Sequence, residues 1–138
     1  MKTASADGED LTEAKNRMVP SEQTRMNVVF HVSSADLGDW RHALRNVRNL
    51  LDDDTVEVDS VTLLANGDAA LLFLEGSPVT DRFEPLIADG IRCRACQNSL
   101  DGRGFDTDQL ADGVEAVPSG VGELVTRQAA GDAYLKVP

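Results

Sequence analysis

Both cysteines of the chain lie in one ten-residue segment, IRCRACQNSL. Cys96 stands where apolar, strand-forming residues give way to polar ones, so we expect it at the carboxyl end of a buried strand. Arg94 supplies a cation two residues before it. Three residues that can donate hydrogen bonds follow directly: Gln97, Asn98 and Ser99. Because cations and hydrogen-bond donors both favour a thiolate, the segment predicts a reactive thiol at Cys96; the alternative is a buried, inert cysteine.

Cys93 and Cys96 also match the CxxC pattern of dithiol redox proteins. The expected strand argues against such a pair, because residues three apart on a strand point to opposite faces and lie roughly 10 Å apart. A disulfide needs Cα atoms within about 7 Å of each other. A redox pair therefore stays open only if the strand ends at Arg92. Otherwise we expect Cys93 to be a small buried hydrophobic residue.

Five apolar runs predict strands, and helical patterns separate them. The expected strands cover residues 26–32, 55–65, 91–95, 114–117 and 133–137. A stripe of apolar residues after the first strand predicts an amphipathic helix that is capped by Ser34 or Asp36 and ends near Leu51. Further helical segments are expected at residues 69–74, 80–88, 107–111 and 121–130. This alternation indicates an α/β fold, a three-layer sandwich with about five mainly parallel strands and helices on both faces.

Ligands of a parallel sheet collect just beyond the carboxyl ends of its strands. The residues expected at that edge, besides the Cys96 segment, are His31, Asn66, Gly67, Pro118, Ser119 and Gly120. His31 is a candidate partner for the thiol, and the alternative is a hydrogen-bonded structural histidine. The dinucleotide-binding, Walker A, nucleophile-elbow and zincin motifs are absent from the sequence. No metal site is expected either, because two cysteines and two histidines do not supply the four clustered ligands of a structural zinc.

The charge balance is strongly acidic, since 24 Asp and Glu face 13 Lys and Arg, for a formal net charge of −11. Such a surface repels nucleic acids and anionic membranes, so neither is an expected partner. The preference for Asp over Glu and the scarcity of Lys are typical of salt-adapted proteins; the alternative is an ordinary acidic bacterial protein. Two cysteines suit a reducing cytoplasm, and the amino terminus lacks the apolar stretch of a secretory signal, so we expect a cytoplasmic protein.

The first 25 residues are mostly polar and show no periodicity that would build a core face. We therefore expect residues 1–25 to be a disordered tail. The strand pattern begins abruptly at Met26, so the sequence predicts one folded domain over residues 26–138.

Four segments together resemble the DsrE/DsrF-like family, in the right order: MNVVFHV, ALRNVRNLL, RACQNSL and VPSGVGELVTRQAAGDAYLKV. The likeness runs from Met26 to Pro138. It implies a three-layer α/β sandwich that assembles as a trimer or hexamer and, in the best understood members, a cysteine that carries sulfur as a persulfide within a relay. On this match Cys96 inherits that role, whereas Cys93 falls at an ordinary strand position.

The leading hypothesis is thus a sulfur carrier or sulfurtransferase-like protein that holds a persulfide on Cys96. It needs no metal or organic cofactor, forms a homo-oligomer and exchanges sulfur with a sulfur-carrier protein. The first alternative is a non-catalytic oligomeric module of the same fold that binds a small ligand or a protein. The second alternative is a CxxC thiol-disulfide redox protein.

Overall fold

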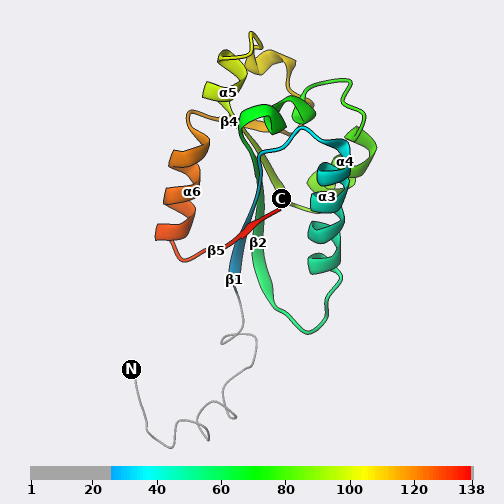
Figure 1. Ribbon diagram of the computed structural model, residues 1–138. Coiled ribbons are helices and arrows are strands. Elements are labelled where there is room, and N and C mark those ends of the chain that lie inside the picture. The colour runs from blue at the N-terminus through cyan, green and yellow to red at the C-terminus, as the bar shows by residue number, and fades with distance from the viewer. Residues whose placement is uncertain (1–25, 138) are drawn as a thin grey trace, which may run out of the picture.

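The computed structural model describes residues 26–137, and the expected disordered tail, residues 1–25, lies outside this range. The centre of the fold is a sheet of five parallel strands in the order β4-β3-β2-β1-β5 (Figure 1). The strands are β1 (Met26–Val32), β2 (Val58–Ala65), β3 (Arg92–Cys96), β4 (Glu115–Val117) and β5 (Ala133–Lys136). Because the strands are parallel, their carboxyl ends share one edge of the sheet. The predicted α/β class and parallel sheet are confirmed.

Helices α3 (Leu37–Leu51) and α4 (Thr80–Ala88) cover one face of the sheet, on the right in Figure 1. The main core lies beneath them. Phe73, at the end of the 3-10 helix η1 (Gly67–Phe73), packs edge-on against the rings of Trp40 and Phe83, with centroids 4.9 and 5.1 Å apart. Since all three rings are fully buried, η1 is held firmly against the core just after β2 ends.

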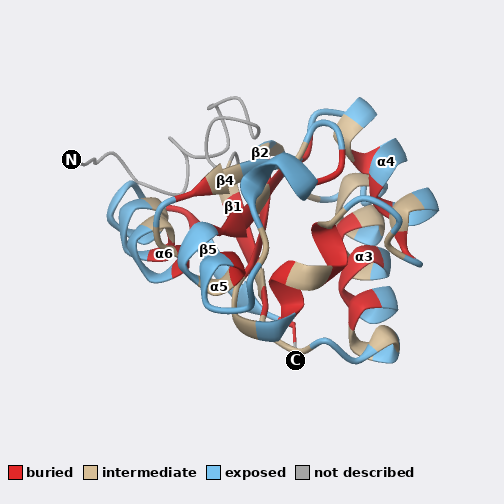
Figure 2. Cartoon of the chain, turned by 90° about the horizontal axis from the view of Figure 1, so that it is seen from above, coloured by how far each residue is buried: buried red, intermediate tan, exposed pale blue. Residues whose placement is uncertain are grey.

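Helix α6 (Gly120–Ala129) covers the opposite face, on the left in Figure 1. A small second core joins it to the sheet, formed by Val29, Leu64, Val117 and Leu124. Figure 2 shows that burial is concentrated on the inner strands and the inner side of α3, whereas α5, α6 and the edge strand β5 are largely exposed. No helix within residues 26–137 is both long and apolar enough to cross a membrane.

Local hydrogen bonds explain one difference from the predicted elements. The second strand begins at Val58 rather than at residue 55. The Asp53 carboxylate accepts the backbone N–H of Thr55 at 2.8 Å, which folds this stretch into a turn before the strand begins.

A second difference lies at residues 107–111. The helix expected there is reduced to a 3-10 turn, η2 (Thr107–Gln109).

The largest difference lies directly after Cys96, where the sequence shows polar residues and no helix was predicted. The chain instead forms the short helix α5 (Gln97–Asp101) at the carboxyl edge of the sheet. The prediction was wrong because the helix is only five residues long and carries no apolar periodicity. Its cap is a cysteine, which is not a usual N-cap residue, so the sequence holds no recognisable start signal.

Candidate functional site

Cys96 is both the last residue of β3 and the N-cap of α5. Its Sγ accepts a hydrogen bond from the backbone N–H of Ser99, with an N···S distance of 3.4 Å. The sulfur thus takes the place of the side-chain oxygen that usually caps a helix. The end of the strand therefore places the thiol at the start of a helix, where backbone N–H groups lack partners within the helix.

The pKa of the Cys96 thiol results from two opposing effects. Cys96 is 5% exposed, and burial alone raises the pKa because it penalises the thiolate. Hydrogen bonds from the Ser99 hydroxyl and from the backbone N–H groups of Gly120, Ser99 and Asn98 lower it. Together these bonds outweigh burial and hold the pKa below its ordinary value. All of the donors are neutral, so local dipoles stabilise the thiolate.

The donors come from two distant segments of the chain, and Gly120 brings the second one close. A Cβ added to Gly120, the first residue of α6, would lie 3.2 Å from Cβ of Cys96 and 2.9 Å from Cβ of Asn66. The second distance is shorter than real Cβ contacts, so a side chain here would displace the helix or the strand ends. Ser119 fixes the helix start by accepting the N–H of Gly122 at 3.1 Å.

The Ser99 hydroxyl is itself held in place. Its Oγ accepts a hydrogen bond from the backbone N–H of Gly67 at 2.7 Å. Because that bond uses an oxygen lone pair, the hydroxyl hydrogen stays available for the sulfur of Cys96. Gly67 opens η1 with φ of +60°, a conformation that favours glycine. Gly67 thus contributes to the site through its main chain.

His31 lies at the same edge of the sheet and orients its neighbours. Its Nε2 lies 2.7 Å from Oδ1 of Asn66, and its Nδ1 lies 2.7 Å from the hydroxyl of Tyr134. An amide oxygen only accepts, so Nε2 carries the proton and the neutral ring accepts the tyrosine O–H at Nδ1. Burial lowers the pKa of His31 more than the bond to Asn66 raises it, and Lys136 lowers it further. Both ring nitrogens are therefore engaged away from Cys96.

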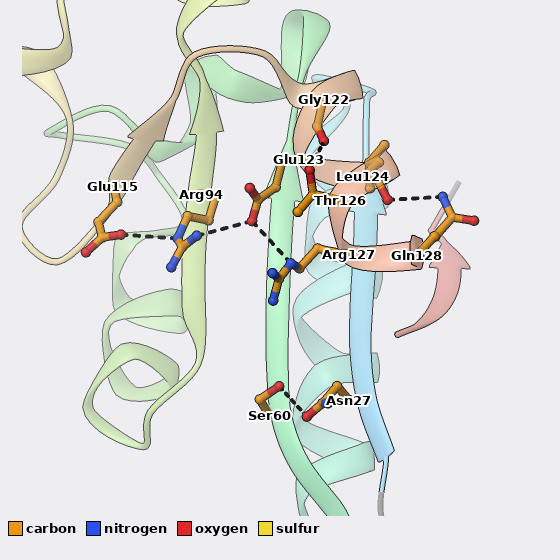
Figure 3. Close-up of polar contacts among 10 residues, drawn as sticks. All are labelled: Asn27, Ser60, Arg94, Glu115, Gly122, Glu123, Leu124, Thr126, Arg127 and Gln128. Atoms are coloured by element: carbon orange, nitrogen blue, oxygen red, sulfur yellow. Dashed lines mark hydrogen bonds and ion pairs between the residues drawn. The ribbon is translucent and has the colours of Figure 1, made fainter. Parts of the chain in front are cut away.

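Arg94 lies on the same face of β3 as Cys96, but its guanidinium makes other contacts. Figure 3 shows it between two carboxylates, with Nε 3.2 Å from Glu115 Oε1 and Nη1 3.2 Å from Glu123 Oε2. Glu123 also pairs with Arg127, one turn further along α6, at 3.8 Å. Arg94 is not among the groups that lower the pKa of Cys96. It ties β3 to α6 and does not supply the cation that the sequence suggested.

The other predicted positions lie around the thiol without bonding it through their side chains. Gln97 is exposed on α5, and Asn98 contributes only its backbone N–H. Pro118 is exposed and lines a depression of about 250 Å³ together with Val117, the neighbour of Cys96 in the sheet. Within residues 26–137, no three His, Cys, Asp or Glu side chains lie close enough together to hold a metal ion.

Two contributors to this edge were not predicted from the sequence, namely Tyr134 and Glu123. Their strand and helix were expected, so the missing information is spatial. Strand β5 pairs with β1 so that Tyr134 lies beside Val29. Val29 and His31 are two residues apart on β1, so their side chains lie on one face of the sheet, and Tyr134 on that same face reaches His31. The sequence alone does not show this contact, because the order of the strands must be known first.

Cys93 lies on the opposite face of β3, in the main core beneath α3 and α4. It is 1% exposed, and burial raises the pKa of its thiol to about 12. Both cysteines are free, and the strand runs without interruption from Arg92 through Cys96. The condition for a redox pair, a strand that ends at Arg92, is therefore not met.

The profile of the DsrE/DsrF-like family matches residues 26–137. MTH1491, a protein of unknown function from Methanobacterium thermoautotrophicum, has 34% identity and a TM-score of 0.75, with 80% of this chain and 98% of that one covered. YchN from E. coli has 24% identity and a TM-score of 0.69 at the same 80% and 98% coverage, which shows the fold alone. No curated protein matches this chain.

A third solved structure also shares the fold. BT1422, a conserved protein of unknown function from Bacteroides thetaiotaomicron, has 14% identity and a TM-score of 0.58, with 87% of this chain and 100% of that one covered. At this low identity the likeness supports the arrangement of the sheet and helices and nothing finer.

The two thiols are expected to differ in their reaction with iodoacetamide. The lowered pKa of Cys96 places its half-maximal rate at a lower pH than that of an ordinary thiol, because thiolate forms as pH rises through the pKa. Cys93, with a pKa of about 12, stays protonated and unreactive throughout the neutral range. Peptide mass spectrometry after timed treatment at several pH values measures each site. Slow reaction of both thiols at neutral pH would contradict an activated Cys96.

Replacing Gly120 by alanine is expected to raise the pKa of Cys96. The added Cβ pushes α6 away from Cys96 and Asn66 and weakens the N–H donor at residue 120. We expect the alkylation rate at neutral pH to fall about tenfold, the equivalent of one hydrogen bond to a charged group. Gly122→Ala is the matched control, since its Cβ would meet only Ser119, at an ordinary 3.5 Å. Equal rates in both variants would show that close approach at Gly120 does not matter.

Proposed function

Because the chain belongs to the DsrE/DsrF-like family, which is associated with sulfur relay, we propose that it is a sulfur carrier that holds sulfane sulfur as a persulfide on Cys96. The observation that carries the proposal is the position of the Cys96 sulfur at the start of α5, where it accepts the backbone N–H of Ser99. Neutral donors there hold the pKa of the thiol below its ordinary value. A thiolate is the nucleophile in sulfur exchange, and a thiol of low pKa is also the better leaving group. Cys96 therefore suits both the uptake and the release of sulfur.

The proposed transfer needs no external oxidant or reductant. In uptake, the Cys96 thiolate attacks the outer sulfur of a donor R–S–SH, a new S–S bond forms and the S–S bond of the donor breaks. The products are Cys96–S–SH and R–S⁻, and the latter takes up the proton that the more acidic persulfide loses. In release, an acceptor thiolate R′–S⁻ attacks the outer sulfur, which yields R′–S–SH and regenerates the Cys96 thiolate.

The neighbours of Cys96 have distinct roles in this proposal. Ser99, Asn98 and Gly120 stabilise the thiolate by hydrogen bonds during uptake and again when Cys96 leaves during release. His31 and Asn66 keep the adjacent strand ends in register, and Arg94 holds α6 in place. We further propose that donor and acceptor are sulfur-carrier proteins or small persulfides of a reducing cytoplasm, where free cysteines persist.

We also propose that the protein works as a homo-oligomer, a trimer or hexamer, as members of this family often do. Apolar side chains are exposed on α6 and on β5. Val121 and Val125, one turn apart on α6, are each 62% exposed. Leu135 of the edge strand β5 is 47% exposed and lies on the other face of the sheet, because it pairs with Phe30 of the main core. Exposed apolar residues next to an unpaired strand edge favour association, because a second copy removes both from water.

The oligomer is tested by placing a charge on α6. We expect the wild type to sediment as a multiple of its 14.8 kDa chain and Val125→Asp to shift toward the single chain, because a carboxylate is costly to bury in a subunit contact. Thr126→Asp is the control and should sediment as the wild type does, because Thr126 is exposed on the same helix but lies about 100° around it from Val125. A wild type that sediments as a single chain would contradict self-association.

Sulfur uptake on Cys96 is tested by mass. After incubation with polysulfide and removal of excess reagent, the wild type should gain about 32 Da, the mass of one sulfur atom, because the Cys96 thiolate takes the sulfane sulfur. Cys96→Ser should gain nothing, whereas Cys93→Ser, which removes the thiol on the other face of the same strand, should label as the wild type does. Equal labelling of wild type and Cys96→Ser would refute the role of Cys96 and favour the non-catalytic module.

A further inference from the structure

Arg103 follows α5 and contacts both α5 and η1. Its Nη1 donates a hydrogen bond to the backbone carbonyl of Ser99 at 3.0 Å. Its Nε and Nη2 donate to Oδ1 of Asp68 at 2.9 and 2.7 Å. One planar guanidinium thus bridges the helix that carries Ser99 and the 3-10 helix that follows β2.

Asp68 belongs to a firmly held part of the fold. It precedes Ala69 and Ala70, which are fully buried in the main core. It follows Gly67, whose N–H donates to the Ser99 hydroxyl at 2.7 Å. Ser99 is therefore connected to η1 twice, directly through its hydroxyl and indirectly through its carbonyl and Arg103.

Helix α5 needs such connections because it is only five residues long. Isolated helices shorter than about 12 residues are marginal in water, so their geometry depends on contacts with the rest of the protein. Ser99 must keep two donors, its hydroxyl and its backbone N–H, directed at the sulfur of Cys96. A small rotation of α5 would turn both away together.

We propose that Arg103 is a positioning residue of the Cys96 site, which holds Ser99 against the sulfur from an anchor on Asp68. This inference rests on the proposed function, because Cys96 is the thiol proposed to carry the sulfur. Arg103 acts through Ser99: its three hydrogen bonds go to the Ser99 carbonyl and to Asp68. Nothing in the sequence marks this role, because an arginine between two glycines looks like an ordinary loop residue.

Two variants separate positioning from simple charge attraction. Arg103→Met removes the bridge, and both explanations predict that the pKa of Cys96 rises. Asp68→Ala also removes the anchor, but it deletes a negative charge near the site. Simple electrostatics predicts that this second change lowers the pKa of Cys96, whereas loss of positioning raises it. The direction of the shift in Asp68→Ala is therefore decisive.

The measurement is the alkylation rate of Cys96 against pH, read by peptide mass spectrometry. In both variants, we expect the pH at which the alkylation rate of Cys96 is half-maximal to rise. We expect the alkylation rate at neutral pH to fall at least about threefold, as for partial loss of hydrogen bonding to a thiolate. Arg82→Met on α4 and Asp54→Ala in the turn after α3 carry the same charge changes and should leave the profile unchanged. Circular dichroism checks the fold, which should persist because the Arg103 and Asp68 side chains are 33% and 65% exposed.

An unchanged profile in Arg103→Met, or a downward shift in Asp68→Ala, would overturn the proposal. Polysulfide labelling of the wild type in parallel separates it from the proposed function. If the wild type takes up no sulfur while both profiles shift upward, the positioning role holds and the sulfur-carrier function fails. If sulfur is taken up and the profiles do not shift, only the positioning role fails.

Discussion

The close packing of α6 against the end of β3 is the contact on which the site depends. Without it, the sulfur of Cys96 would receive donors from α5 alone. The contact needs Gly120, because any side chain there would meet Asn66 and Cys96. It is held chiefly by apolar burial beneath the helix. Burial of a Leu such as Leu124 contributes about 1.5–3 kcal/mol to stability. A partly exposed ion pair such as Arg94 with Glu123 contributes less, near the ~0–1 kcal/mol of surface pairs.

Neutral donors prevail at Cys96 although the protein is strongly acidic. The net charge of −11 opposes any further negative charge, but salt screens exposed carboxylates beyond about 10 Å. Each hydrogen bond to a charged group contributes about 1.5–3 kcal/mol and acts at contact distance, where salt has little effect. The stability of the thiolate is therefore determined by the groups that contact it. The arginines nearby connect elements of the fold without their charges altering the pKa of Cys96.

The elements of the fold could be predicted from local signals, whereas the contacts at the site could not. Ser34 or Asp36 was predicted as the cap of the first helix, and it is the Asp36 carboxylate that accepts the N–H of Asp39, at 3.0 Å. The helix Thr80–Ala88 was predicted with its observed bounds. Arg94, by contrast, was assigned to the thiol because the two are close in sequence. Its real partners come from β4 and α6, and no local pattern reveals that these elements lie beside β3.

The two thiols lie three residues apart on one strand and differ in their environment because of the geometry of the sheet. Because three is an odd number, the pleat sends Cys93 and Cys96 to opposite faces. On the face under α3 and α4, burial without donors raises the pKa of Cys93 to about 12. On the other face, at the strand end, donors from two helix starts overcome burial and lower the pKa of Cys96. The same residue type is thus a core side chain in one place and a candidate nucleophile in the other, and the difference arises from position in the sheet.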